Sequence, residues 1–219
     1  MIEIRNLRHR SLDIPSLAIP PGRTAVIGLN GSGKTTFLSL CVGIALPQGG
    51  SILLDGRPPR ETDVGWVAEF PDRNMLFDRV SDEIASPLRF RFVPAPRIRE
   101  AVERIAADVG ISGLLARNPR SLSGGEKTLV ALATALVSRP VVLVLDEFDS
   151  HLDAETLGEA ERAIGRARVP YVLQCTQNPH VARSADRVLY MEAGRVRDLG
   201  ALDRMFRAGD ADRAAWELP

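Results

Sequence analysis

The sequence predicts a wound α/β fold interrupted by a helical insertion, and two observations carry this prediction. Strand-like apolar runs alternate with segments of helical periodicity over most of the 219 residues, which favours a parallel sheet covered by helices. The alternation stops between residues 71 and 121, where no strand pattern occurs. We therefore expect a single domain, with residues 1–70 and 122–219 forming the core and residues 71–121 forming a helical subdomain.

Each element of the core follows from a local pattern. Short aliphatic runs bounded by Pro-Gly or Asp-Gly turns predict strands, and apolar residues three and four apart predict helices. The expected strands cover residues 2–4, 16–19, 24–27, 51–54, 64–68, 141–145, 171–175 and 187–191. The expected helices cover residues 35–46, 124–138, 153–168 and 202–208. The run 141–145 is wholly aliphatic, which indicates a strand buried on both faces.

The insertion contains one clear helical pattern. Its apolar stripe consists of Ile98, Ala101, Val102, Ile105 and Val109. Gly110 follows the stripe directly, at the position where a glycine commonly ends a helix. We therefore expect an amphipathic helix that stops at Gly110.

Composition excludes several classes of protein. The chain has 28 Lys and Arg against 28 Asp and Glu, whereas a dedicated nucleic-acid binder needs a basic surface. No apolar run reaches the 18 residues of a membrane span, and the N-terminus does not read as a signal peptide. Cys41 and Cys175 lack metal or redox spacing, which fits a reducing cytosol. We expect a cytoplasmic globular protein that does not bind nucleic acid.

A glycine-rich segment between the strand 24–27 and the helix 35–46 is the first functional signal. Residues 28–35 read Gly-Leu-Asn-Gly-Ser-Gly-Lys-Thr, the spacing of a phosphate-binding loop in the context that this motif requires. Backbone N–H groups and a helix N-terminus hold the phosphates, Lys34 adds a point charge, and the Thr35 hydroxyl binds Mg²⁺. Only Lys34 and Lys127 among the 28 basic residues are lysines.

Two further motifs are a pair of carboxylates and a second loop that can bind an anion. Asp146 and Glu147 end the aliphatic strand, where an Asp can hold Mg²⁺ through water and a Glu can act as general base. Residues 122–126 read Leu-Ser-Gly-Gly-Glu at the start of a predicted helix, a second anion site. Because this second loop brings no lysine into the motif, we expect it to serve the nucleotide of another molecule.

Taken in order, these motifs and the following Ser150-His151-Leu152-Asp153 resemble the ATP-binding cassette (ABC) ATPases over nearly the whole chain. The resemblance implies a phosphate-loop NTPase core with an N-terminal antiparallel β portion and an inserted helical subdomain. It also implies ATP and Mg²⁺ as ligands. A further implication is a head-to-tail dimer, with this chain or a homologous ATPase as the second subunit, that encloses two ATP molecules.

The resemblance also assigns roles by position. The nucleotide would be bound by Gly28, Asn30, Gly31, Ser32, Gly33, Lys34, Thr35 and Thr36, and across the dimer by Ser123, Gly124, Gly125 and the dimer-contacting Asp153. Mg²⁺ would be bound by Thr35, Glu69 and Asp146. The catalytic set would be Glu147, Gln177 and Glu69.

Residues 70–84 resemble a narrower group, the ATPases of energy-coupling factor and cobalt-type importers. Phe70-Pro71-Asp72, Asn74-Met75-Leu76-Phe77 and Val80-Ser81-Asp82-Glu83-Ile84 carry this likeness. In that group the region receives a coupling helix from an integral-membrane partner. The resemblance implies a location on the inner face of the cell membrane, peripheral to such partners.

The chain departs from the family pattern at four places. Glu69 stands where the family has a glutamine, and Gln177 stands where it has a switch histidine, with His180 three residues further on. Residues 1–36 lack the aromatic that stacks on adenine, which leaves His9, Arg8 or Arg10 to stack on the base. Phe148-Asp149 replace the usual Pro-Thr, and the pattern offers no reason for the exchange.

These features predict an ATPase that powers vitamin or metal-ion uptake through dimer closure, with hydrolysis weakened by the loss of the histidine. One alternative is a non-hydrolysing interaction subunit, or a degenerate partner in a heterodimeric ATPase. Another is a soluble ABC protein without a transport role, although such proteins commonly carry long coiled coils or two cassettes.

Overall fold

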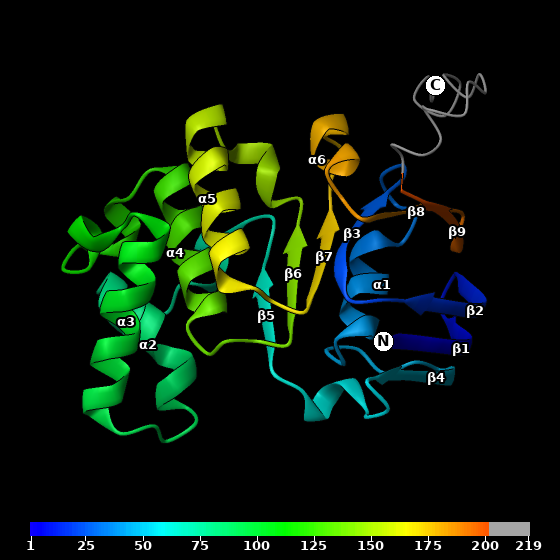
Figure 1. Ribbon diagram of the computed structural model, residues 1–219, viewed down its shortest axis with the longest axis horizontal. Helices are drawn as coiled ribbons and strands as arrows, with labels where there is room; N and C mark the ends of the chain where they lie inside the picture. The colour runs from blue at the N-terminus through cyan, green and yellow to red at the C-terminus, as the bar shows by residue number, and fades with distance from the viewer. Residues whose placement is uncertain (202–219) are drawn as a thin grey trace.

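The computed structural model describes residues 1–201, and these form two sheets and a cluster of helices, α2 to α5, beside the larger sheet (Figure 1). The strands are β1 (Ile2–His9), β2 (Leu12–Ile19), β3 (Gly22–Ile27), β4 (Gly49–Leu54), β5 (Val64–Val67), β6 (Val142–Asp146), β7 (Tyr171–Cys175), β8 (Arg187–Glu192) and β9 (Arg195–Gly200). The α-helices are α1 (Lys34–Cys41), α2 (Val80–Arg89), α3 (Ala95–Val109), α4 (Gly124–Leu136), α5 (Ala154–Ala167) and α6 (Pro179–Arg183). Short 3₁₀ turns are η1 (Pro59–Glu61), η2 (Pro71–Asn74), η3 (Ser112–Leu114), η4 (Pro119–Ser121) and η5 (Phe148–His151).

The larger sheet has the strand order β5-β6-β7-β3-β8-β9 and is parallel apart from the β8–β9 hairpin. The smaller sheet, β2-β1-β4, is antiparallel. This arrangement confirms the α/β fold class with an antiparallel portion built from N-terminal residues. Residues 71–121 contain helices and no strand, as the pattern predicts.

Strand β6 separates the two main parts of the hydrophobic core. All five of its residues are buried. Leu143 and Leu145 pack into a cluster with α2 to α5, whereas Val142 and Val144 pack into a cluster with α1 and the antiparallel sheet. Successive side chains on a strand point to opposite faces, so an aliphatic run is what this position requires.

Several predicted boundaries were wrong. Helix α1 ends at Cys41, well before residue 46, because Gly43 adopts a left-handed φ of 74° beside the backbone of Arg60. The first two strands are each eight residues long, and β9, α2 and α6 were not predicted. The helix expected over residues 202–208 lies outside the described residues.

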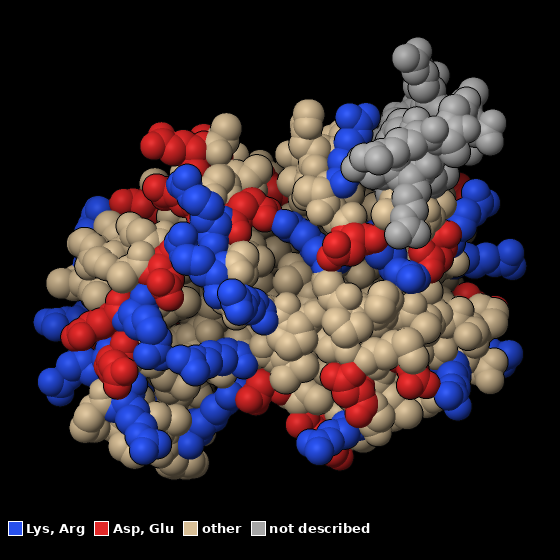
Figure 2. All heavy atoms as spheres, in the orientation of Figure 1, with Lys and Arg blue, Asp and Glu red and all other residues tan. Residues whose placement is uncertain are grey.

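Parallel β6 and β7 direct their carboxyl ends to the same edge of the sheet, where η5 and α6 follow them (Figure 1). The loop between β3 and α1 opens at this edge as well, because β3 is parallel to β7. Crevices at the carboxyl ends of parallel strands are the usual ligand sites of such sheets. On the visible face, acidic and basic side chains are mixed over the helical half (Figure 2).

Candidate functional site

The loop between β3 and α1 has the conformation of an anion cradle. Gly28, Gly31 and Gly33 have φ values of 146°, 80° and 101°, in the region that favours glycine. A Cβ on Gly28 would collide with the carbonyl oxygen of Met191, and one on Gly33 would meet the Leu12 side chain. The backbone therefore turns tightly into the N-terminus of α1, whose first N–H groups have no helical acceptor.

Lys34 lies at the centre of this loop, with only 6% of its side chain exposed. Its Nζ donates hydrogen bonds to the carbonyl oxygens of Gly28 at 2.9 Å and Leu29 at 3.2 Å. The same nitrogen lies 3.8 Å from Glu147 Oε1. The ammonium is therefore held where the loop, the helix N-terminus and a carboxylate meet.

Ser32 supplies an independent sign of a ligand. Its Oγ is buried and has no hydrogen-bond partner among the described residues. Burying a hydroxyl without a partner costs free energy, so such groups in native proteins call for an explanation. An anion bound in the loop would accept the hydrogen bond that Ser32 does not otherwise make.

Carboxylates gather beside the loop, which fits a cation. Thr35 Oγ1 donates to Asp146 Oδ1 at 3.2 Å. Burial raises the pKa of Asp146, and the nearby charges of Glu147 and Glu69 raise it further, while the Thr35 hydrogen bond lowers it. A divalent cation would relieve this repulsion. No three His, Cys, Asp or Glu side chains within residues 1–201 form a self-sufficient metal site. Mg²⁺ commonly combines one or two carboxylates with substrate phosphates.

The pKa of Asp146 leads to a stability prediction. A carboxyl group with a raised pKa binds its proton more tightly in the folded state, so ionised Asp146 destabilises the fold above that pKa. We expect Asp146→Asn to raise the Tm of the nucleotide-free chain at pH 7 by about 2–4 °C, or about 1 kcal/mol. The gain should shrink as the pH falls through the raised pKa. Calorimetry at several pH values measures both effects.

Asp198→Asn is the matched control for this substitution, because Asp198 forms an ion pair with Arg187, whereas Asp146 lies beside other carboxylates. It should leave the Tm unchanged or lower it. A fall in Tm for Asp146→Asn at pH 7 would contradict the electrostatic account of this site.

Glu147 is turned toward the loop by its backbone. Its φ of 48° is left-handed, an uncommon conformation for a residue other than glycine. Its N–H donates to the carbonyl oxygen of Cys175 at 3.0 Å, which ties the end of β6 to the end of β7. The carboxylate then accepts a hydrogen bond from Gln177 Nε2 at 3.3 Å. Strain of this kind concentrates at functional sites.

Gln177 links the two halves of the site. Besides Glu147, its Nε2 donates to Asn30 Oδ1 of the phosphate loop at 3.1 Å. His180 is exposed on α6, and the described hydrogen bonds place Gln177, not His180, against Glu147. The structure therefore brings together Asn30, Lys34, Glu147 and Gln177, which the sequence places on three separate segments.

The Leu-Ser-Gly-Gly-Glu loop lies elsewhere. Ser123 caps α4 by accepting from Glu126 N, and Glu126 reciprocates to Ser123 N. Ser123 and Gly124 are exposed, and no described hydrogen bond joins Ser123 to the phosphate loop of the same chain. Asp153 likewise caps α5, and the bond from Thr156 N lowers the pKa of Asp153. These predicted site residues therefore face solvent within one chain.

The β1–β2 turn carries the residues considered for base stacking. Arg10 has a left-handed φ of 51°, and its N–H donates to Gln48 Oε1 at 2.8 Å. Leu12, two residues on, packs beside Gly33 of the phosphate loop. The turn therefore borders the phosphate loop.

Sequence reasoning missed the partners of this edge. Cys175 is buried behind Glu147, with its Sγ 3.8 Å from Oε1, and burial raises the pKa of the thiol well above its usual range. Asp149, for which the sequence pattern offered no reason, is buried and accepts a hydrogen bond from Thr176. Their long-range pairing left no signal in either local segment.

Comparison with known proteins gives a consistent picture. The family model described as ABC transporter matches residues 12–150, more than half of the chain. The energy-coupling factor transporter ATP-binding protein EcfA1 of Streptococcus agalactiae is 33% identical over 216 residues, covering 94% of this chain and 77% of that protein. The nickel import ATP-binding protein NikO of Rhodobacter capsulatus is 39% identical over 206 residues, covering 84% and 80%.

Among solved structures, cbiO1 of Clostridium perfringens, described as part of the ABC transporter complex cbiONQ, superposes with a TM-score of 0.84. It is 26% identical, and the match covers 98% of this chain and 93% of that one. None of the helices described in residues 1–201 is long and apolar enough to span a membrane.

Proposed function

The chain belongs to the ABC transporter family, and we propose that it is the subunit that binds and hydrolyses ATP to power a membrane importer. The convergence of Lys34, Glu147 and Gln177 carries this proposal. An ammonium, a carboxylate and an amide at one end of a phosphate loop are suited to moving a terminal phosphoryl group to water.

We assign phosphate binding to the loop and the first turn of α1, that is, to Gly28, Asn30, Gly31, Ser32, Gly33, Lys34, Thr35 and Thr36. Their backbone N–H groups and the orphaned Ser32 hydroxyl support this assignment. When ATP enters, its oxygens would replace the two loop carbonyls that Lys34 now contacts.

Hydrolysis would proceed by attack of water on the γ-phosphorus. Glu147 takes the proton of that water as the new P–O bond forms, and the bond to the β-phosphate oxygen breaks to release ADP. Lys34 stabilises the charge that develops on the phosphate oxygens. Gln177 holds the Glu147 carboxylate through its amide and keeps it directed at the loop.

Mg²⁺ fits the donor set beside the loop. Thr35 and Asp146 are in contact, and Glu69 is close enough to raise the pKa of Asp146. When bound, Mg²⁺ would neutralise charge on the β- and γ-phosphates. We assign Thr35, Asp146 and Glu69 to its binding, with Glu69 supplying a charged oxygen where a glutamine is usual.

A second subunit would complete the site. The exposed positions of Ser123 and Gly124, away from the phosphate loop of their own chain, support a head-to-tail dimer in which they and Gly125 cover the partner's γ-phosphate. Asp153 would contact the dimer partner. The second subunit would be another copy of this chain or a homologous ATPase.

The known relatives support the proposed role in import. EcfA1 is an energy-coupling factor subunit, NikO a nickel importer subunit, and cbiO1 part of a transporter complex. We therefore infer uptake of a vitamin or metal ion through integral-membrane partners, with this chain bound at the inner face of the cell membrane. Leu76, 77% exposed in the segment 70–77, supports a docking surface there.

Affinity purification of the tagged chain from detergent-solubilised membranes of its own organism tests this proposal. Proteins with several membrane spans should co-purify, and the recovered complex should hydrolyse ATP in the presence of Mg²⁺. Recovery of ATPase activity with no integral-membrane partner would contradict the importer role and favour a soluble ABC protein.

Gln177 motivates a second candidate, a subunit that binds ATP and dimerises without turnover. An amide can donate to a phosphate oxygen, but it cannot carry a proton as histidine does. We expect the double substitution Gln177→His and Glu69→Gln to raise turnover about tenfold or more. Steady-state ADP release measures the change.

The control for this gain is Gln48→His, which adds a histidine in the loop between α1 and β4, where the side chain contacts Arg10 rather than Glu147. It should leave turnover unchanged. If the double variant is no faster than the native chain while the native chain already turns over rapidly, hydrolysis is not weakened by these two residues.

A further inference from the structure

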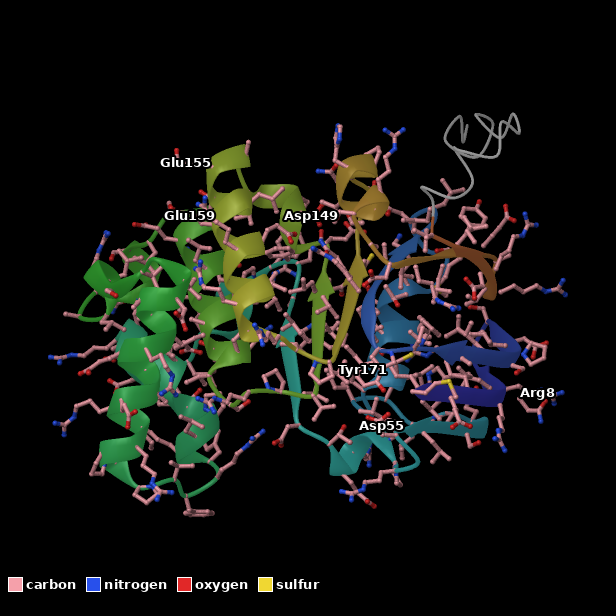
Figure 3. All side chains as sticks on the ribbon, viewed as in Figure 1. Arg8, Asp55, Asp149, Glu155, Glu159 and Tyr171 are labelled. Atoms are coloured by element: carbon pink, nitrogen blue, oxygen red, sulfur yellow. The ribbon has the colours of Figure 1, made fainter. Side chains whose placement is uncertain are left out.

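A chain of polar side chains runs through the sheet behind Gln177. Glu161 of α5 pairs with Arg23 of β3, and Arg23 contacts Gln174 of β7. Gln174 reaches Asp149 of η5, and Asp149 in turn contacts Thr176. Gln174, Asp149 and Thr176 are 0%, 9% and 1% exposed. Asp149 lies between α5 and α6 in Figure 3.

Each bond in this chain joins a donor atom to an acceptor atom, and its direction follows from the neighbouring bonds. Arg23 Nε donates to Gln174 Oε1 at 3.0 Å, so the amide must present its NH₂ group to Asp149. Gln174 Nε2 lies 3.4 Å from Asp149 Oδ1. Thr176 Oγ1 accepts from Asn178 N at 2.9 Å, so its hydroxyl proton is free to be donated to Asp149 Oδ2 at 2.6 Å.

The last two bonds enclose Gln177. The Thr176 hydroxyl connects η5 to the backbone on both sides of that residue, because it binds Asp149 and the N–H of Asn178. Gln177 itself is exposed, and within the described residues its amide bonds reach only Asn30 and Glu147. The direction of its side chain therefore depends on a backbone that is held from behind.

We propose that Asp149 is a positioning residue for hydrolysis, which acts through Thr176 to hold Gln177 against Glu147. This proposal rests on the proposed function, since it assumes that Gln177 assists Glu147. It gives the exchange of the usual Pro-Thr for Phe148-Asp149 a physical reason: Phe148 fills the core, and Asp149 binds the loop that carries the substituted residue.

The substitution Asp149→Asn removes the negative charge and changes the hydrogen bonding of the side chain but keeps its shape. Its oxygen can still accept from Gln174, but its NH₂ group cannot accept the proton that the Thr176 hydroxyl now donates to Asp149 Oδ2. The charge-assisted bond from Thr176 to the carboxylate is therefore lost at constant volume. A small displacement of an orienting group commonly costs far more in rate than in binding.

The experiment measures single-turnover ATP hydrolysis with enzyme in excess, so that slow chemistry is still observed. Asp149→Asn and Thr176→Val should each lower the rate about tenfold. A separate steady-state measurement should give a KM for ATP within about twofold of native. Thr176→Ser keeps the hydroxyl and should rescue most of the rate. In a Gln177→Ala background, Asp149→Asn should add less than about a twofold further loss.

Asp55→Asn is the matched control. Asp55 accepts a hydrogen bond from the Tyr171 hydroxyl at 2.6 Å. Figure 3 shows both residues toward the opposite end of β7. The Asp55–Tyr171 pair, like the Asp149–Thr176 pair, joins a hydroxyl donor to a carboxylate, but it is remote from Gln177. Asp55→Asn should leave the rate unchanged. Hydrogen exchange over residues 174–178 gives a readout independent of turnover, and it should speed up in Asp149→Asn but not in Asp55→Asn.

Three results would overturn the proposal, and they are distinguishable. If Gln177→Ala slows hydrolysis but Asp149→Asn does not, Asp149 has no positioning role and the proposed function stands. If the two losses multiply fully, Asp149 acts independently of Gln177. If Gln177→Ala has no effect at all, the role assigned to Gln177 fails together with the inference that rests on it.

Discussion

Replacement of Glu147 by glutamine is expected to lower ATP turnover by about 100- to 10,000-fold, the range that a general base contributes. The amide has the same shape as the carboxylate and can still accept from Gln177 Nε2. It cannot take a proton from water. Because the loss falls on the chemical step, the reduction belongs in kcat and not in the affinity for ATP.

Affinity should even rise in this variant. The Glu147 carboxylate lies 3.8 Å from Lys34 Nζ, in the region that the phosphates would enter. Removing its charge lessens repulsion against ATP, so we expect ATP to bind more tightly and the proposed dimer to persist longer. Single-turnover hydrolysis measures the loss of turnover. Nucleotide titration measures the gain in ATP affinity, and size-exclusion chromatography measures the persistence of the dimer.

Glu103→Gln provides the control. Glu103 is exposed on α3, so this substitution removes the same charge from a different surface. It should leave these measurements unchanged. Retention of more than about a tenth of native turnover by Glu147→Gln would assign the base to another group, because a tenfold loss corresponds to only 1.4 kcal/mol.

The contiguous part of the site could be predicted because its geometry is local. Gly28 to Thr35 fold into a loop whose shape follows from glycine positions and the start of a helix, and nothing distant is needed to recognise it. Asp146 was placed in the same way, as the end of a strand whose aliphatic run reveals burial on both faces. The structure agrees with these local expectations.

The remainder depends on contacts that no local pattern records. The left-handed backbone of Glu147 and the pairing of Asp149 with Thr176, 27 residues away, arise only when β6 and β7 lie side by side. Strand β9 was missed because half of its residues are exposed and the others are only partly buried, so that pairing with β8 holds it rather than full burial. Residue-level chemistry at such positions follows from topology.

Lys34 is expected to be the main source of ATP affinity, and Lys127, the other lysine of the chain, provides a control for substitutions at position 34. Lys34→Ala should lower ATP affinity about 100-fold, because charge-assisted hydrogen bonds contribute about 1.5–3 kcal/mol each. The same change leaves the Gly28 and Leu29 carbonyl oxygens without their donor in the nucleotide-free protein. Isothermal titration with ATP and Mg²⁺ measures the affinity.

Lys34→Arg is the more informative variant, since it keeps the charge. The Lys34 side chain is 6% exposed, and its Nζ fits between two carbonyl oxygens that a planar guanidinium cannot contact in the same geometry. We expect affinity to fall at least about tenfold. Lys127→Arg, on α4, should bind ATP as the native chain does. Equal affinity in both arginine variants would mean that charge alone, without shape, satisfies the loop, and that the retention of lysine at position 34 in an arginine-rich chain has another cause.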